Sequence, residues 1–112
     1  MARLRWFKRG VARHMNNQQT RLLWAELPNA VNLTWDEAQK EARYNPNEWR
    51  IPHLYEFKEA LDQGVIAFEK GVYWTSLWYH PNACTINTAN REVKVEPTSE
   101  KRMVRFVKEL IK

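Results

Sequence analysis

Residues 49–57 read Trp-Arg-Ile-Pro-His-Leu-Tyr-Glu-Phe, and this stretch does most to decide the fold. A proline restricts the preceding residue to extended backbone, so Ile51-Pro52 predicts an extended entry after which His53 caps a helix. Gly64 is the natural stop, because glycine readily takes the left-handed conformation that ends helices. Apolar residues recur at helical spacing in between and predict the buried face: Leu54, Phe57, Ala60 and Leu61.

A second helix is predicted upstream of this block. Thr34 and Glu37 have the spacing of a capping box, in which each side chain accepts a hydrogen bond from the other residue's backbone N–H. The helix should run from Trp35 to Arg43 or Tyr44, because the sequence Asn45-Pro46-Asn47 then breaks it.

Downstream of residue 71 the pattern changes to one typical of strands. The predicted strands are Val72–Thr75, Ala83–Thr88, Glu92–Val95 and Met103–Val107. Ala89-Asn90 predicts a hairpin turn between two of them. Short helices among strands indicate an α+β domain with a mainly antiparallel sheet. At 112 residues the chain (1–112) is expected to form a single domain.

The order of several short blocks resembles a known family. These blocks are Arg21-Leu22-Leu23-Trp24, Leu33-Thr34-Trp35-Asp36-Glu37-Ala38, Trp49-Arg50-Ile51-Pro52, Tyr73-Trp74-Thr75-Ser76 and Val104-Arg105-Phe106-Val107. Over roughly residues 5–108 the chain resembles the Lcl C-terminal domain family, bacterial and phage domains related to the formylglycine-generating-enzyme architecture. The resemblance implies a compact C-type-lectin-like domain, with two short helices packed on a mainly antiparallel twisted sheet. Such a fold carries many unrelated sites, so it implies little chemistry.

The chain departs from the family pattern at two places. Basic residues and Asn16-Asn17-Gln18-Gln19 occupy the position of the family's usual Gly/Asp-rich stretch. Phe106 stands where the family usually has a cysteine, so a disulfide of the family type is absent.

Six tryptophans supply much of the apolar area that this small domain can bury. Trp24, Trp35, Trp49 and Trp74 are predicted to form the core. Trp6 and Trp78 lie beside basic or loop residues, so both a core role and a ligand contact stay open for them.

Positive charge is concentrated in a basic arm at about residues 1–21. Six basic residues precede the first acidic residue, Glu26, whereas residues 22–112 carry 12 basic and 13 acidic groups. The arm favours either contact with a polyanion or a solvated strand edge whose charges prevent aggregation. Its candidate binding residues, which include an aromatic side chain able to stack on bases, are Arg3, Arg5, Trp6, Lys8, Arg9 and Arg13.

Catalytic and metal sites are not predicted. Cys84 is the only cysteine, so the cysteine chemistry of the formylglycine-generating relatives has no redox pair here. His80 and Cys84 form one pair of metal-binding type, whereas structural zinc normally needs four ligands. A Cys84 nucleophile beside His80 would also need a third, orienting group. We therefore expect no enzyme activity, no metal and no cofactor.

Localisation is expected to be cytoplasmic. The N-terminus has no apolar stretch of the length that a secretory signal needs, and no window approaches a membrane span. A single cysteine excludes an intramolecular disulfide and requires no oxidising compartment. A small leaderless member of the resembled family would fit a phage or mobile-element protein that acts inside a bacterium.

The leading functional hypothesis is a non-enzymatic protein-binding module. Lectin-like folds display variable loops, and the predicted contact loop contains Trp78, Tyr79, His80 and Asn82. One form of this hypothesis is an inhibitor of a host intracellular complex that handles nucleic acid. The alternative is a nucleic-acid or polyanion binder that uses the basic arm. Carbohydrate binding is less favoured, because the sequence has no acidic calcium cluster.

Overall fold

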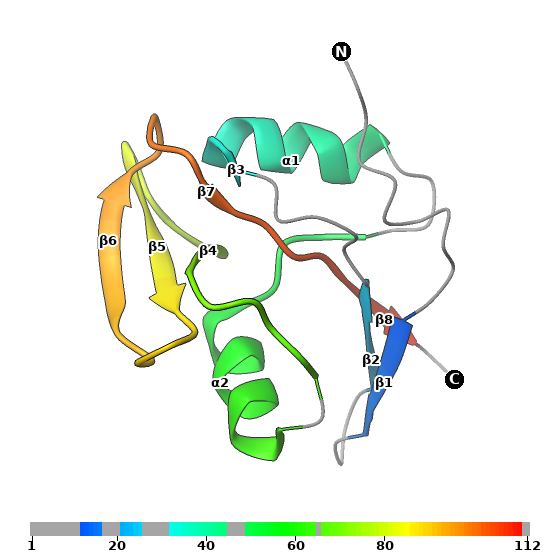
Figure 1. Ribbon diagram of the computed structural model, residues 1–112. Coiled ribbons are helices and arrows are strands. Elements are labelled where there is room, and N and C mark those ends of the chain that lie inside the picture. Colours follow the sequence, from blue (N-terminus) through cyan, green and yellow to red (C-terminus); the bar gives the residue numbers. More distant parts are fainter. Residues whose placement is uncertain (1–11, 17–20, 26–31, 45–48, 65, 111–112) are drawn as a thin grey trace.

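The chain folds as an α+β domain with two helices and eight strands within the described residues (Figure 1). A computed structural model describes residues 12–16, 21–25, 32–44, 49–64 and 66–110. The helices are α1 (Trp35–Tyr44) and α2 (Leu54–Gln63). The strands are β1 (Ala12–Asn16), β2 (Arg21–Ala25), β3 (Asn32–Leu33), β4 (Val72–Tyr79), β5 (Asn82–Asn87), β6 (Val93–Pro97), β7 (Arg102–Met103) and β8 (Val107–Leu110).

The strands form two sheets. The small sheet has three strands in the order β1-β2-β8, and the large sheet has five in the order β3-β7-β4-β5-β6. Pairing within both sheets is antiparallel except at Tyr73 and Met103, where β4 and β7 run parallel. In Figure 1 the large sheet lies to the left and the small sheet to the right. The predicted compact α+β layout with a mainly antiparallel sheet is confirmed, whereas the C-type-lectin-like assignment stays a prediction.

Helix α1 begins and ends where the sequence predicts. The Thr34 N–H donates to Glu37 Oε1 at 2.9 Å and the Glu37 N–H donates to Thr34 Oγ1 at 3.1 Å, which is the predicted capping box. The bond from the Thr34 backbone holds the pKa of the Glu37 carboxyl below its ordinary value. The acidic first turn also suits the positive end of the helix dipole.

Helix α2 also has its predicted bounds. The His53 N–H donates to Glu56 Oε1 at 2.7 Å, and Gly64 ends the helix with a φ of 69°, a left-handed conformation that favours glycine. Arg50 binds both carboxylate oxygens of Glu56 at 3.0 and 2.8 Å, and also binds Glu109. Arg50 further exchanges backbone hydrogen bonds with Val107. The Trp-Arg-Ile-Pro block therefore joins α2 to the small sheet.

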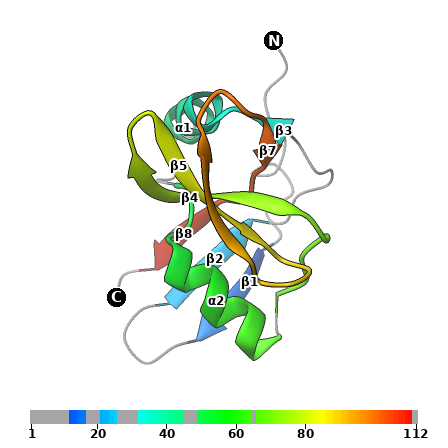
Figure 2. The same ribbon diagram turned by 90° about the vertical axis from the view of Figure 1, so that its left-hand side faces the viewer.

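The two helices cover opposite faces of the large sheet (Figures 1 and 2). Successive side chains of a strand point to opposite faces. Trp74 accordingly belongs to the apolar cluster that contains Trp35 and Ala38 of α1, whereas Tyr73 belongs to the cluster that contains Phe57 and Ala60 of α2. The predicted α2 residues Leu54 and Leu61 pack against that second cluster while partly exposed.

Two sequence predictions need correction. The single strand predicted at Met103–Val107 is wrong: β7 ends at Met103 in the large sheet and β8 begins at Val107 in the small sheet. The intervening residues are buried while the chain crosses between the sheets, and the N–H of Ala25 donates to the Phe106 carbonyl there. The segment was predicted as one strand because its residues are mostly apolar, and a buried crossing has the same composition as a buried strand.

The second correction concerns the tryptophan core. Trp24, Trp35 and Trp74 are buried as predicted. Trp49 is only half-buried, because it packs against the rim of the α1-side cluster instead of lying inside it.

Candidate functional site: the β4–β5 hairpin

The predicted contact loop forms the tip of the β4–β5 hairpin. Trp78 pairs with Ala83 and Tyr79 pairs with Asn82, so these strands continue to the tip. The register shifts between Trp74 and Trp78, and such an irregularity bends and twists a strand. The hairpin therefore carries the last residues of β4 away from the packed part of the sheet.

Trp78 is exposed but held in place. Its side chain is 53% exposed, and its ring stacks on Trp35 of α1 with 5.8 Å between centroids and an interplanar angle of 5°. Trp35 is itself fixed, because its Nε1–H donates to the Thr75 carbonyl of β4 at 3.0 Å. On the other side His80 meets the Trp78 ring edge-to-face at 5.5 Å. One face of the indole is thus supported, and much of the remainder faces solvent.

Tyr79 exposes a second aromatic ring on the opposite face of the hairpin. It is 53% exposed and follows Trp78 directly in β4. Asn82, its cross-strand partner, is half-buried. The structure therefore brings together all four predicted loop residues, Trp78, Tyr79, His80 and Asn82, at one end of the molecule.

The turn of the hairpin is tied to the rest of the domain. The backbone N–H and the hydroxyl of Thr98 both donate to the Pro81 carbonyl, at 3.1 and 3.0 Å. The Thr98 carbonyl in turn accepts a hydrogen bond from the Trp35 N–H at the start of α1. These bonds connect the turn, the segment after β6 and α1, so the aromatic residues are presented by a braced loop.

Most of the predicted basic arm lies outside the described residues. This applies to Arg3, Arg5, Trp6, Lys8 and Arg9. Arg13 lies in β1, at an edge of the small sheet and paired with Trp24. The position of Arg13 on an edge strand agrees with either interpretation of the arm.

A groove of about 510 Å³ lies beside α2, and sequence reasoning did not find it. It is lined by His53, Leu54, Tyr55, Lys58, Ser76 and Leu77. Within it His53 Nδ1 and Ser76 Oγ form a 2.6 Å hydrogen bond, and the His53 ring stacks on Tyr55. A histidine and a serine 23 positions apart carry no spacing signal in the sequence, so only the tertiary structure joins them.

The backbone N–H groups next to Ser76 already have hydrogen-bond acceptors. A serine nucleophile uses nearby backbone N–H groups to stabilise an oxyanion. Here the Ser76 N–H donates to the Pro52 carbonyl at 2.9 Å, and the Leu77 N–H donates to Thr75 Oγ1 at 3.3 Å. Both adjacent donors are therefore occupied, and the His53–Ser76 bond joins the start of α2 to β4.

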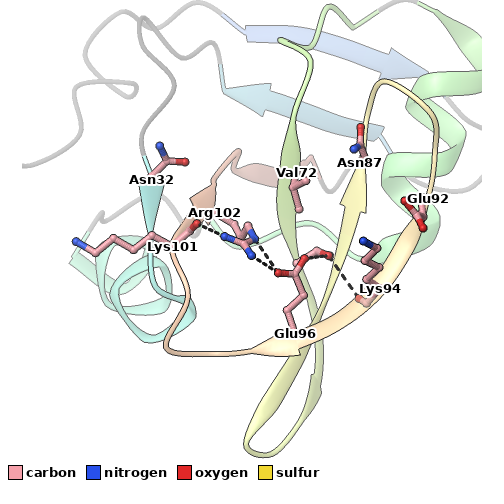
Figure 3. Close-up of a pocket in the computed structure, with 9 residues that line it drawn as sticks. Asn32, Val72, Asn87, Glu92, Lys94, Glu96, Lys101 and Arg102 are labelled. Atoms are coloured by element: carbon pink, nitrogen blue, oxygen red, sulfur yellow. Dashed lines mark hydrogen bonds and ion pairs between the residues drawn. The ribbon is translucent and has the colours of Figure 1, made fainter.

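A polar pocket of about 440 Å³ lies over one face of the large sheet, between β3 and β6 (Figure 3). Its lining residues are Asn32, Val72, Thr85, Asn87, Glu92, Lys94, Glu96, Lys101 and Arg102. Arg102 donates to Glu96 Oε1 through Nε at 2.8 Å and also through Nη2, while Thr85 Oγ1 donates to Glu96 Oε2 at 2.8 Å. Burial opposes ionisation of Glu96, but the hydrogen bonds from Arg102 and Thr85 prevail and lower its pKa.

Cys84 does not have the environment of a nucleophile. Its side chain is buried in β5, and burial raises the pKa of the thiol despite a hydrogen bond from Thr75. His80, the partner considered for it, lies at the exposed hairpin tip with its ring against Trp78. The His80 ring is therefore exposed, whereas the Cys84 thiol is buried.

No group of three or more His, Cys, Asp or Glu side chains able to hold a metal ion occurs among the described residues. Neither described helix is long and apolar enough to cross a membrane.

Comparison with known proteins does not assign a family. The sequence matches no family model, and no curated protein matches it. The resemblance to the Lcl C-terminal domain family stays a prediction.

Proposed function

We propose that this chain is a non-enzymatic protein-binding module whose contact surface is the tip of the β4–β5 hairpin. The observation that carries the proposal is the half-exposed Trp78, whose ring is stacked on Trp35. An exposed indole that is already ordered loses little conformational entropy on binding. Tryptophan and tyrosine are also among the residues that contribute most energy to protein interfaces.

The surroundings of the tip support a contact surface with several anchors. Tyr79 adds a second exposed ring, and His80 and Asn82 add polar groups beside the aromatic rings. Large apolar groups flanked by polar groups are the arrangement found at the centre and rim of protein interfaces. The buried thiol of Cys84 and the occupied N–H groups around Ser76 argue in the same direction, against covalent catalysis.

The partner that fits the proposal is an intracellular protein. A single cysteine needs no oxidising compartment, so we place the chain in the cytoplasm as part of this proposal. Inhibition of a host complex by a phage or mobile-element protein is the specific form that we favour.

The experiment is a pull-down from bacterial lysate with the wild-type chain, with and without nuclease, followed by affinity measurement on the recovered protein. Replacing Trp78 or Tyr79 by Ala should each weaken binding by about 2 kcal/mol or more, as expected of interface hot spots. Tyr55→Ala is the matched control, because Tyr55 is an exposed ring on α2. Binding that depends on Tyr55 and is unaffected by both hairpin variants would contradict the proposal.

The second candidate function is nucleic-acid binding through the basic arm, which the segregation of charge in the sequence favours. Recovery that disappears on nuclease treatment would support it. Binding to a generic DNA duplex would then fall steeply with salt, and neutralising Arg3, Arg5, Lys8 and Arg9 would flatten that dependence. For a protein partner, the same four changes should mainly slow association.

A further inference from the structure

Strand β6 forms an open edge of the large sheet in the part of the chain that the structure describes. In the strand order β3-β7-β4-β5-β6 it is the terminal strand, and Figures 1 and 2 place it on the outside of the molecule, away from the small sheet. Val93 and Val95 are 38% and 54% exposed. An edge strand with exposed apolar side chains offers a template for pairing with a further strand.

The register identifies the backbone groups at this open edge. The Asn87 N–H donates to the Glu92 carbonyl at 2.8 Å, and hydrogen-bonded pairs recur at every second residue of an antiparallel ladder. Lys94 and Glu96, which pair with Thr85 and Ala83, therefore direct their backbone groups towards β5. The N–H and C=O groups of Val93 and Val95 consequently point outward, whereas the Pro97 carbonyl already accepts a hydrogen bond from the Glu100 N–H at 3.1 Å.

The sequence of β6 is complementary to itself in the antiparallel direction. When two copies pair about a two-fold axis through Val95, this residue faces its own equivalent and the two exchange both backbone hydrogen bonds. Val93 of each copy then faces Pro97 of the other, whose carbonyl is already bonded to the Glu100 N–H, so the two bonds between the Val95 residues carry the backbone pairing. Pro97 has no N–H, but it lies at the end of the strand, so the central pairing is unaffected.

The charges agree with this register. Lys94 of each copy lies opposite Glu96 of the other, in a non-hydrogen-bonded pair where Cα atoms approach to about 4.5 Å and opposite charges are favourable. The Glu96 carboxylate is held in place by Arg102 and Thr85. Lys94 forms no ion pair with any residue that the structure describes, although its charge already helps to lower the pKa of Glu96 in its own chain. The pairing would bring it against Glu96 of the second copy.

We propose that the chain forms a two-fold symmetric homodimer by antiparallel pairing of β6 with β6 of a second copy, centred on Val95. The pairing is isologous and closes on itself, so it yields dimers and not filaments. It joins the two large sheets into one continuous sheet. This inference does not depend on the hairpin's function, because Trp78 and Tyr79 lie on β4, which β5 separates from the pairing edge.

The predicted association is weak, because one short strand pair buries less surface than a stable interface of about 1,200–2,000 Å². Sedimentation equilibrium of the full chain, at about 10 µM to 1 mM, covers the corresponding range of dissociation constants. We expect a monomer–dimer equilibrium whose dissociation constant rises with salt, since the Lys94–Glu96 contacts are charged. A wild-type chain that stays monomeric throughout this range overturns the proposal.

Val95→Pro is the decisive variant. It removes the central N–H donor from both copies, and the monomer should tolerate it because this N–H faces outward from an edge strand. We expect loss of the dimer with an unchanged circular dichroism spectrum. Val95→Thr is the matched control, because it keeps the N–H and the β-branched shape, and it should dimerise. A Val95→Pro chain that is folded and dimerises like the wild type places the contact elsewhere and overturns the proposal.

Two measurements keep the proposal testable even where Val95→Pro does not fold. Lys94→Glu places like charges opposite each other and should raise the dissociation constant at least tenfold, whereas Lys94→Arg should leave it within about threefold. Hydrogen exchange at the Val95 amide should also slow as protein concentration rises, because pairing protects this N–H. Equal dissociation constants for the two Lys94 variants, or exchange at Val95 that is independent of concentration, would exclude β6 as the interface.

Discussion

Trp74 and Trp78 lie four positions apart in β4, yet the first is buried and the second is exposed. Trp74 is fully buried, and its Nε1–H donates to the Leu33 carbonyl of β3 at 2.8 Å. Trp78 is 53% exposed, and its ring stacks on Trp35 and meets His80 edge-to-face. Their neighbours make the difference, because β3 and the interior of the domain enclose the first half of β4 whereas the hairpin carries the second half outward. One strand therefore serves stability at its start and presents a surface at its end.

The largest effect is expected from truncation within the buried half. Trp74→Ala should lower the free energy of unfolding by about 3–5 kcal/mol, because it leaves a cavity in the α1-side cluster. Trp78→Ala should cost about 0.5–1.5 kcal/mol, the usual value of an aromatic pair. Denaturant titration measures both. Equal losses of stability for the two variants would mean that the two halves of β4 contribute alike to stability, which would contradict the inference drawn from their different burial.

A smaller, pH-dependent effect should come from the same face of the sheet, at Glu96. Its pKa is lowered from an ordinary value of 4.5, so its contribution to stability is present above that pH and is lost as pH falls through the folded-state pKa. Glu96→Gln should lower the free energy of unfolding by about 1–2 kcal/mol at neutral pH. The difference from wild type should shrink below about pH 4.5.

Glu92→Gln is the control for this measurement, because Glu92 is an exposed carboxylate just before β6. It should change stability by less than about 0.5 kcal/mol at any pH. A wild-type minus Glu96→Gln difference that persists unchanged to acid pH would indicate that packing, and not ionisation, is responsible.

The smallest effect is expected at Cys84, on the strand beside β4. Because the thiol is buried and its pKa is raised, a thiol reagent should modify it slowly in the native protein and rapidly in denaturant. Cys84→Ser should leave partner binding nearly unchanged, since the hairpin tip does not include this side chain. Rapid modification of the native protein, or loss of binding with the fold intact, would support a functional role for the thiol together with His80.

Local signals predicted the local structure well. The Thr34 and Glu37 pair and the Ile51-Pro52 dipeptide predicted both helices, because capping and proline geometry act over only a few residues. The role of the four residues around Trp78 stays a prediction, and three of them, Trp78, Tyr79 and Asn82, lie in strands instead of the expected loop.

Features that depend on distant residues were missed. The groove that joins His53 to Ser76 and the pocket network of Glu96, Arg102 and Thr85 bring together positions that share no sequence spacing. The division of residues 103–107 between two sheets was missed for the same reason, because a buried crossing and a buried strand have the same apolar composition.

The sequence by itself determined which segments become helices and where they begin and end, through caps, proline and glycine that act on adjacent backbone. It also determined which side chains are large and aromatic. Only the tertiary structure decided which of those aromatic side chains are enclosed, because enclosure depends on strands and helices that arrive from elsewhere in the chain. Trp74 meets the Leu33 carbonyl 41 positions away, whereas Trp78 stands beyond the edge of that packing and faces solvent.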